Sequence, residues 1–290
     1  MVENMAATGL HLVGTGAGSP LNMTVGGKEI ASSCDYRFLE GYTSLLGENG
    51  ENRLEKLVGA YEIIRRPEVE NPERILELAK SNSVALLVVG DPMQATTHVD
   101  LLLRCKDEGI HTSVHHAVSA VDLVCAGLGL QSYRFGRQVS LTFPHGNHLP
   151  TSPLEFIAEN RFLGLHTLVL LDLDPTGMGI EQPQPMTPPQ AFEVMCRMVE
   201  RLKDDPPPHL ELENVSSARD LSRLKAVKWL LNEKIGDVHA VICSNLGSSN
   251  AQIKSGLLSK ITENCVSGIH SIVITGELIG MEKDALEKLH

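Results

Sequence analysis

Aromatic side chains are scarce in this chain of 290 residues. They make up 4% of the sequence, and Trp229 is the only tryptophan. The apolar core must therefore be built from Leu, Val, Ile and Ala, a composition that favours parallel strands covered by helices over an aromatic-rich sandwich of sheets. With 42% hydrophobic and 21% charged residues, the chain has the composition of a folded protein, and this excludes a disordered polypeptide.

Concentrated positive charge is lacking as well. The chain has 25 Lys and Arg against 36 Asp and Glu, which gives a formal net charge of −11 with histidine neutral. Its densest basic stretches, Arg65-Arg66 and Lys225–Lys228, are short and flanked by acidic residues. Binding to a phosphate backbone requires a dense basic surface. We therefore expect no direct contact with nucleic acid, and instead a protein or small-molecule partner.

Long apolar runs and paired cysteines are also absent. No run approaches the roughly 20 residues that cross a bilayer, and residues 1–9 lack the basic region and cleavage site of a secretory signal. We therefore expect a cytoplasmic protein that does not enter a membrane. No C-x-x-C pair occurs, which predicts reduced, mostly buried thiols and neither a disulfide framework nor a zinc site. The six cysteines are Cys34, Cys105, Cys125, Cys196, Cys243 and Cys265.

Short apolar runs alternate with amphipathic stretches, the pattern of β-α-β units in an α/β protein. Strands rich in Val, Ile and Leu are predicted at residues 10–13, 84–89, 167–173, 238–243 and 271–274. Helices are predicted at residues 24–33, 73–80, 97–107, 154–161 and 188–203. Thr24 is the predicted N-cap of the first helix, and Pro188 marks the start of the last. Loops at 144–153 and 172–189 and a break at 204–208 interrupt the pattern.

This organisation predicts two domains. Residues 1–116 are expected to form an N-terminal α/β domain that carries a glycine-rich loop and a Gly-Asp-Pro loop. Residues 119–290 are expected to form a C-terminal α/β domain.

The glycine-rich loop, Gly14-Thr15-Gly16-Ala17-Gly18-Ser19-Pro20, follows the first strand. Glycine lets the backbone turn tightly and lets a ligand approach without Cβ atoms in the way. The dinucleotide fingerprint G-x-G-x-x-G is incomplete, because Ser19 stands at its last position and Pro20 breaks the entry into a helix. These residues alone support a tight turn and a ligand-binding loop equally.

The second loop, Gly90-Asp91-Pro92 and the residues up to His98, joins a buried strand to a helix. It places backbone amides and a carboxylate at the carboxyl edge of a sheet, where open α/β folds bind ligands. The alternative is purely structural: Asp91 forms an Asx turn and Thr96 caps the helix that follows.

The adjacent His115 and His116 give only a weak signal for a metal. Neighbouring residues on a strand point to opposite faces, and no Cys or carboxylate stands at ligand spacing, so we expect no metal site. A helix is expected to begin at Ser119-Ala120, and the first turn of a helix offers free backbone N–H groups to a ligand.

Taken together and in this order, these segments resemble the diphthine synthases, the methyltransferases of the diphthamide pathway within the tetrapyrrole (corrin/porphyrin) methylase superfamily. The resemblance extends from about Leu10 to Gly280. It rests on residues 12–18, 39–44, 88–92, 95–98, 130–136, 160–161, 166–168 and 270–276. The Gly-Asp-Pro loop is shared across the superfamily, whereas Tyr42-Thr43-Ser44 and Ala95-Thr96-Thr97-His98 are more particular to the diphthine branch.

The resemblance implies two α/β domains of the tetrapyrrole methylase type, with S-adenosylmethionine bound in the cleft between them, in a homodimer. Main-chain groups of several loops hold the cofactor in this family. The matching positions here are Ala17, Asp91, Gln94, Ser119, Ala120, Leu171, Leu246 and His270.

Three residues depart from the family pattern. Ala17 stands where a larger apolar residue is common, Gln94 where glycine is usual, and Asn245 where arginine is frequent. Contacts through the backbone tolerate the first of these changes. A side chain at Gln94 is expected to narrow the pocket or to force a different φ angle.

The resemblance also implies the reaction: methyl transfer to the modified histidine of elongation factor 2, the diphthine intermediate. The transfer acts on its amine and, in eukaryotic members, also on a carboxylate, which gives diphthine methyl ester. Methylation of an amine requires the loss of a proton, so a base such as His98, His116, His166 or Asp122 is expected to assist. The sequence selects none of these four.

Three alternatives remain open. A small-molecule methyltransferase of the tetrapyrrole type is disfavoured by the Tyr-Thr-Ser and Ala-Thr-Thr-His segments. A nicotinamide-dependent dehydrogenase with Glu40 holding a ribose is disfavoured by the missing third glycine. A non-catalytic binding module is made conceivable by Ala17 and Gln94.

Overall fold

The computed structural model describes residues 6–288, which pack into two units. The first unit comprises residues 6–123 with the segments 178–183 and 245–250, and the second comprises 124–177, 184–244 and 251–288. Both units are α/β, with one five-stranded sheet each, as the sequence predicts. The domain division at 1–116 and 119–290 stays a prediction.

The sheet of the first unit is parallel throughout, in the order β3-β2-β4-β1-β5. Its strands are β1 (Gly9–Gly14), β2 (Tyr36–Glu40), β3 (Glu62–Ile64), β4 (Ser83–Val88) and β5 (Thr112–His115). All six residues of β1 and of β4 are buried, because these two strands occupy the middle of the sheet.

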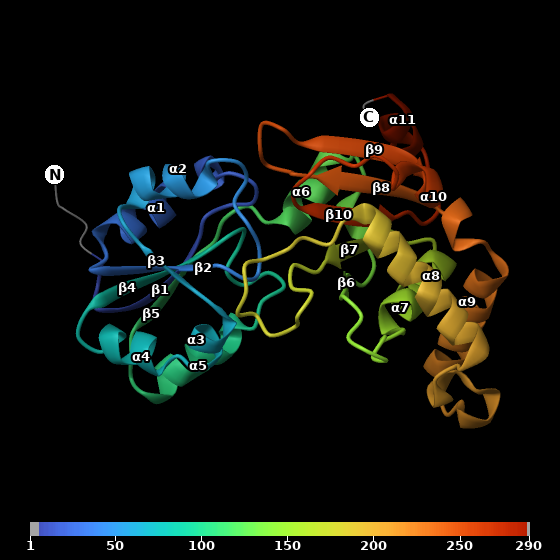
Figure 1. Cartoon of the computed structure of the whole chain (residues 1–290), viewed down its shortest axis with the longest axis horizontal. Helices are drawn as coiled ribbons and strands as arrows, with labels where there is room; N and C mark the ends of the chain where they lie inside the picture. The colour runs from blue at the N-terminus through green and yellow to red at the C-terminus, as the bar shows by residue number, and fades with distance from the viewer. Residues whose placement is uncertain (1–5, 289–290) are drawn as a thin grey trace. The chain divides into compact units, whose positions relative to one another are not determined.

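Helices cover both faces of this sheet (Figure 1). They are α1 (Val25–Ser33), α2 (Gly50–Val58), α3 (Arg66–Glu70), α4 (Glu73–Ala79) and α5 (His98–Asp107). Alternate strand residues divide between two apolar clusters: Leu10 and Leu12 of β1 join the cluster with α3, α4 and α5, whereas Val13 joins the cluster with α1 and α2. This period of two is the alternation expected of a strand.

The sheet of the second unit is mixed, in the order β6-β7-β10-β8-β9. Its strands are β6 (Val139–Leu141), β7 (Thr167–Leu171), β8 (His239–Ser244), β9 (Gln252–Leu257) and β10 (His270–Ile274). Only β6 and β7 are parallel, and the other three pairings are antiparallel. The expectation of parallel strands is wrong here, because a buried apolar strand has the same composition in either orientation and the short connection 245–251 allows a direct antiparallel return.

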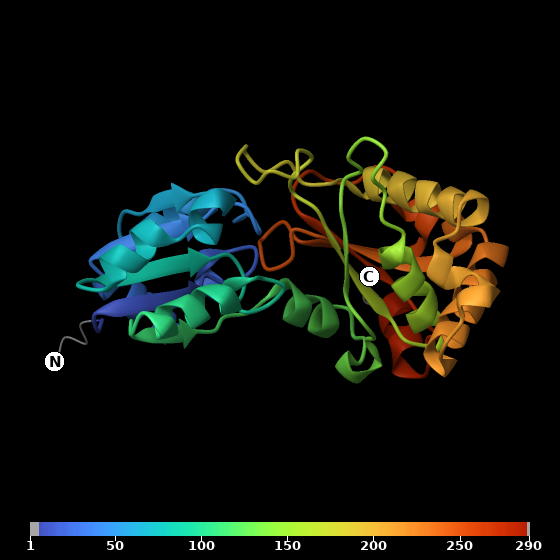
Figure 2. The ribbon, with the colours of Figure 1, turned by 90° about the horizontal axis from the view of Figure 1, so that it is seen from below.

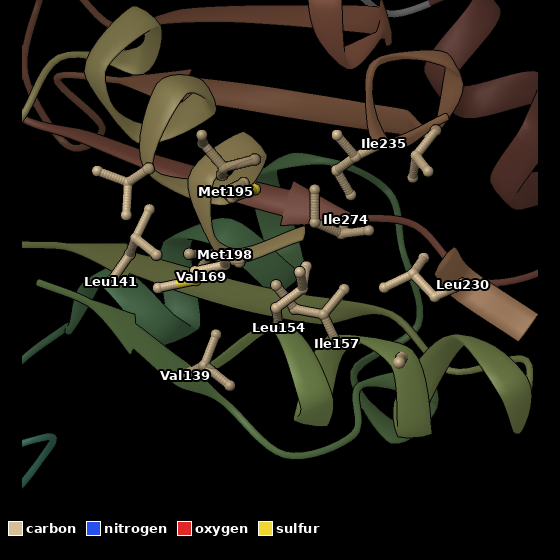
Figure 3. Close-up of a cluster of buried hydrophobic side chains, with 14 of the residues drawn as sticks. Val139, Leu141, Leu154, Ile157, Val169, Met195, Met198, Leu230, Ile235 and Ile274 are labelled. Atoms are coloured by element: carbon tan, nitrogen blue, oxygen red, sulfur yellow. The ribbon is translucent and has the colours of Figure 1, made fainter. Parts of the chain in front are cut away.

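The main core of the second unit lies between this sheet and the helices α7 (Ser152–Phe162), α8 (Pro188–Asp204) and α9 (Ala218–Asn232), which lie together in Figures 1 and 2. Figure 3 shows Leu154 and Ile157 of α7 packed among Met198 of α8 and Val169 of β7. The remaining helices are α6 (Ala120–Gly127), α10 (Leu258–Ile261) and α11 (Met281–Lys288). Short 3-10 helices are η1 (Pro20–Asn22), η2 (Ser132–Arg134), η3 (Pro208–Leu210), η4 (Leu212–Asn214) and η5 (Ile235–Asp237).

Each predicted strand and helix is present, with ends that shift by at most about two residues. Thr24 caps α1 by accepting a hydrogen bond from the Gly27 amide, and Pro188 opens α8. Cys34, Cys105 and Cys243 are buried and the other three cysteines are partly buried, in line with the prediction of mostly buried thiols. In the part of the chain that the structure describes, no helix has the length and apolarity to span a membrane.

Candidate functional site

Four loops of the first unit meet at the carboxyl edge of its parallel sheet. The glycine-rich loop after β1 bonds to the loop after β4, since the Gly16 amide donates to the Gly90 carbonyl at 3.2 Å. It also bonds to the segment after β5, where the Ala17 amide donates to the Val118 carbonyl at 2.9 Å. The fourth loop, 245–250, is joined by Asn22, whose Nδ2 donates to the carbonyl of Gly247 at 2.9 Å. This is the edge at which open parallel sheets bind ligands.

Two glycines let the first and fourth loops pack backbone to backbone. Gly18 has φ +73, and a Cβ added there would lie 2.1 Å from the carbonyl oxygen of Leu246. Gly247 has φ +80, and its Cβ would lie 2.2 Å from the carbonyl oxygen of Ala17. Both the backbone conformation and the space therefore require glycine. The tight turn predicted for the glycine-rich loop is confirmed, and it brings the backbones of Ala17 and Leu246 together.

Asp91 ties the Gly-Asp-Pro loop to the segment after β5. Its Oδ1 accepts from the Met93 amide at 2.8 Å, which is the predicted Asx turn. Its Oδ2 accepts from the Ala117 amide at 3.1 Å and lies 2.8 Å from Nδ1 of His116. The Asp91 side chain is only 6% exposed, so its negative charge is held in place by three donors.

The residue that takes the unusual backbone conformation in this loop is Ala95 and not Gln94. Ala95 has φ +57, whereas Gln94 is exposed and has no positive φ. The expected change of φ thus falls one residue later than the sequence indicates. The expectation that Thr96 caps the next helix is also wrong: the N-cap of α5 is Thr97, and the Thr96 hydroxyl donates to the Pro92 carbonyl at 2.7 Å.

Ser119 and Asp122 bond to each other at the start of α6. The amide and the hydroxyl of Ser119 donate to Oδ2 of Asp122 at 2.9 and 2.7 Å, and the Asp122 amide donates to the Ser119 hydroxyl at 3.3 Å. This reciprocal pattern stabilises a helix start. The Ser119 amide is therefore not free for a ligand, contrary to the expectation from the helix start alone, although the residue stays beside the loops.

A buried pair of Glu40 and His98 joins the end of β2 to the start of α5 at the same edge of the sheet. His98 Nε2 lies 2.6 Å from Glu40 Oε2, and His98 Nδ1 donates to the Pro92 carbonyl at 2.7 Å. Burial favours the neutral ring, but the hydrogen bond and charge of Glu40 outweigh it and raise the pKa of His98. Glu40 Oε1 also accepts from the Thr43 amide at 3.1 Å, so this carboxylate is committed inside the unit and does not hold a ribose. The only sign of this pair in the sequence is Glu40, a charged residue at the end of an apolar strand.

The second unit contains the other two predicted cofactor positions, Leu171 and His270. Leu171 ends β7, and His270 begins β10. His270 Nδ1 bonds to the Ser244 hydroxyl at 2.8 Å, while its buried Nε2 has no hydrogen-bond partner among the described residues. Burial lowers the pKa of His270, so the ring is neutral at neutral pH.

His166, one of the four candidate bases, lies inside the second unit. Its Nδ1 accepts from the Gly276 amide at 3.0 Å, and its Nε2 faces Glu282 Oε1 at 3.3 Å. Burial lowers the pKa of His166, and Glu282 opposes this only in part. The side chain is fully buried and therefore has a structural role.

The structure thus places six of the eight predicted positions in the first unit. Ala17, Leu246, Asp91, Gln94, Ser119 and Ala120 all belong to the four loops or to the start of α6. Asn245, which replaces a frequent arginine, has φ +53, a left-handed conformation that asparagine tolerates well. Among residues 6–288, no three His, Cys, Asp or Glu side chains are arranged to hold a metal ion.

Comparison with known proteins relates this arrangement to a family. The model of the tetrapyrrole (corrin/porphyrin) methylases matches residues 9–262. Diphthine methyl ester synthase of Saccharomyces cerevisiae is 38% identical over 273 residues, which are 92% of this chain and 84% of the relative. The enzyme of that name from Yarrowia lipolytica is 35% identical over 272 residues, with the same coverage.

The fold gives the same result. A crystal structure of diphthine synthase superposes on this chain with a TM-score of 0.76 at 28% sequence identity, and the match covers 96% of this chain and 94% of the other. The chain therefore belongs to the tetrapyrrole (corrin/porphyrin) methylase family, in its diphthine synthase branch, and is an S-adenosylmethionine-dependent methyltransferase.

Proposed function

We propose that this protein methylates the modified histidine of elongation factor 2, on its amine and also on its carboxylate, to give diphthine methyl ester. The observation that carries the proposal is the 38% identity, over 92% of the chain, to a diphthine methyl ester synthase. The proposal extends the activity in that relative's name to this chain, and it names S-adenosylmethionine as the methyl donor.

The residues at the carboxyl edge of the first sheet fit such a donor. Around Gly90, which has φ +86, an added Cβ would meet only the Ser119 Cα, at 3.9 Å, so the backbone there is open to a ligand. The unpartnered, buried Nε2 of His270 is a second group that a polar ligand would satisfy. We assign the cofactor to Ala17, Asp91, Gln94, Ser119, Ala120, Leu171, Leu246 and His270, largely through main-chain groups.

Once bound, S-adenosylmethionine supplies a methyl group that its sulfonium has already activated. The protein's task is then to hold the accepting atom in line with that methyl group, which is a positioning effect. Asp91 fixes the Gly-Asp-Pro loop through its three donors, and the loops of Ala17 and Leu246 are fixed by backbone packing. A preformed site of this kind does not spend binding energy on ordering loops.

Methyl transfer to elongation factor 2 tests the reaction directly. Wild-type protein should transfer label from methyl-labelled S-adenosylmethionine to elongation factor 2 that carries the unmethylated modified histidine, and mass spectrometry should show both amine and ester methylation. Cofactor binding without transfer would favour a non-catalytic module. Binding of NAD without binding of S-adenosylhomocysteine would favour a dehydrogenase.

A matched pair of glycine variants tests the cofactor site. Gly18→Ala introduces a Cβ at φ +73 against the Leu246 carbonyl and should weaken S-adenosylhomocysteine binding at least tenfold by calorimetry. Gly26→Ala, in α1, meets no atom within 4 Å and should leave the affinity unchanged. Equal affinities of the two variants would remove the glycine-rich loop from the site.

The net charge of −11 has a role in this proposal. The tip of a translation factor that faces RNA is expected to be basic, and an acidic enzyme would attract it over a distance. The association rate should therefore fall as the salt concentration rises from low to physiological. A rate that does not depend on salt would contradict this steering.

Two further properties belong to the proposal. We assign the protein to the cytoplasm, where elongation factor 2 acts, and we expect it to form a homodimer without direct contact to nucleic acid or a membrane. Light scattering of the purified chain should give twice the monomer mass of 31.5 kDa. A monomer at micromolar concentration would contradict the dimer.

A further inference from the structure

The environments of the four candidate bases are very different. A general base needs a nitrogen or oxygen with an unshared lone pair that substrate can reach. His98 has both ring nitrogens against acceptor oxygens, so the charged ring has no lone pair to offer. His166 is fully buried and uses both nitrogens inside the second unit. Asp122 is exposed, but its Oδ2 is bound to Ser119 at the start of α6, and a carboxylate is in general a weaker base than an imidazole.

His116 is the one of the three candidate histidines with an accessible lone pair. Its side chain is 68% exposed, and its Nδ1 lies 2.8 Å from Oδ2 of the nearly buried Asp91. A carboxylate can only accept a hydrogen bond, so Nδ1 must carry the ring proton. In the neutral ring the other nitrogen, Nε2, then carries the lone pair, and the side chain as a whole is largely exposed. This is the geometry of a histidine oriented by a carboxylate, as in hydrolytic triads.

The position of His116 connects it to the candidate cofactor loops. The same Asp91 oxygen that faces His116 accepts from the amide of Ala117, and a Cβ added at Gly14 would lie 2.8 Å from the Ala117 side chain. Ala17 bonds to Val118, two residues after His116. The histidine therefore stands at the rim of the loops to which the cofactor is assigned.

We propose that His116 Nε2 is the general base for methylation of the substrate amine, with Asp91 as its positioning residue. This inference rests on the proposed function. The amine of the substrate arrives protonated, and Nε2 accepts one proton from it. The freed nitrogen lone pair forms the new N–CH3 bond while the S–CH3 bond breaks and its electron pair stays on sulfur. Asp91 stabilises the imidazolium, which loses its proton to water because the ring is exposed.

The proposal separates the two kinds of methylation. Each methyl group added to the amine displaces one proton, so each addition needs the base. The carboxylate is already an anion at neutral pH, and its methylation releases no proton. His116 should therefore matter for the amine and not for the ester.

A matched pair of histidine variants tests this distinction. His116→Ala should slow methylation of the amine about 100-fold or more. Ester formation on elongation factor 2 whose amine is already fully methylated should change less than threefold. His111→Ala is the control, because His111 is also exposed in the first unit but has no side-chain hydrogen bond in the described structure. It should keep both rates. Mass spectrometry of single-turnover reactions counts the methyl groups added.

The possible outcomes separate this inference from the proposed function. If wild type transfers methyl groups and His116→Ala methylates the amine at the same rate, the base assignment is wrong and the function stands. If His116→Ala slows the ester step equally, the residue positions substrate and is not a base. If wild type methylates neither group, the function and the inference fail together.

The tautomer of His116 can be measured without any activity. Nitrogen-15 spectra of the free protein, recorded where the ring is neutral, should show the proton of His116 on Nδ1 and a lone pair on Nε2. Asp91→Asn should reduce this preference, since its amide no longer offers two acceptor oxygens. The titratable groups near the ring are Asp91 by contact and His115 by sequence. A neutral ring with its proton on Nε2 in wild type would overturn the proposal.

Discussion

The first unit divides its apolar core between the two faces of its sheet, whereas the main core of the second unit lies on one face. The difference follows from strand direction. Parallel strands need long crossovers, and these place helices on both faces, while antiparallel strands return through short connections. The four loops of the candidate site all start from or pack on the parallel sheet. Strand direction thus determines which unit supplies most of the site.

The two units also treat buried histidines in opposite ways. In the first unit Glu40 raises the pKa of the buried His98 despite the cost of burial. In the second unit burial dominates and lowers the pKa of His166, and it lowers that of His270 as well. A carboxylate thus raises the pKa of His98, whereas burial lowers the pKa of His166 and His270. The same residue type therefore supports an ion pair in one core and a neutral hydrogen-bond network in the other.

The largest effect on stability is expected from breaking the buried pair of Glu40 and His98. Glu40→Gln leaves the buried His98 without its counter-charge and should lower the free energy of unfolding by about 3–5 kcal/mol, measured by urea denaturation at pH 7 with circular dichroism. Glu62→Gln is the control, because Glu62 bonds to Arg74 on the surface, where both side chains are about half exposed. Surface pairs contribute about 1 kcal/mol or less. Equal losses in the two variants would contradict the buried-pair interpretation.

The core of the second unit should respond nearly as strongly. Leu154 is fully buried in the main cluster, so Leu154→Ala leaves a cavity and should cost about 2–5 kcal/mol. Trp229, the only tryptophan, lies on α9 of this unit, and its fluorescence during urea unfolding reports on the second unit specifically. Leu212→Ala, at a site that is 67% exposed, should leave the transition in place. A small loss for Leu154→Ala would mean that α7 repacks around the cavity.

A pH series sharpens the contrast between the histidines. A group whose pKa is lowered by folding stabilises the protein above its unfolded pKa, about 6.5 for histidine, and this stability is lost as the pH falls. The Trp229 transition should therefore move to lower urea between pH 7.5 and 5.5, because His166 and His270 must be neutral in the fold.

His98 has the opposite sign. Its raised pKa gives stability that is complete below about pH 6.5 and is lost as the pH rises through the raised value. The stability difference between wild type and Glu40→Gln should therefore shrink in alkaline solution. A difference that grows with pH would show that His98 is neutral in the fold.

The smallest effect on stability is expected at the helix N-caps, a feature that the two units share. Thr24 caps α1 in the first unit, and Ser217 caps α9 in the second, each by accepting a hydrogen bond from the amide three residues later. Thr24→Ala and Ser217→Ala should each cost about 1 kcal/mol. Thermal unfolding of both variants checks this. A cost near zero for one of them would mean that water replaces the hydroxyl at that helix start.

The sequence predicts what depends on local patterns. Thr24 and Pro188 mark helix starts because caps and prolines act within one turn, and the Asx turn of Asp91 spans three residues. The pairing of His98 with Glu40 joins residues far apart in the chain, and no local pattern encodes it. The same holds for the antiparallel order of the second sheet, which depends on how buried strands pair in three dimensions.

The candidate site shows the same limit. Ala17, Asp91 and Leu246 are identified by a resemblance of short segments, but the role of His116 depends on a carboxylate 25 positions earlier in the chain. Ser119 is correctly placed beside the loops, yet its amide is used by Asp122 and not by a ligand. Residue types indicate where a site lies, whereas the hydrogen-bond partners decide which groups remain available.

The backbone packing of Gly18 against Leu246 has a consequence for how the chain can diverge. Main-chain atoms make this contact, so the side chains at Ala17 and Leu246 can change over generations without altering its shape. The substitutions that would disturb this contact are then those at Gly18 and Gly247, where any other residue adds a Cβ. A related chain could differ from this one at many residues of the loops and keep the same contact, while one lacking either glycine would have had to rebuild it.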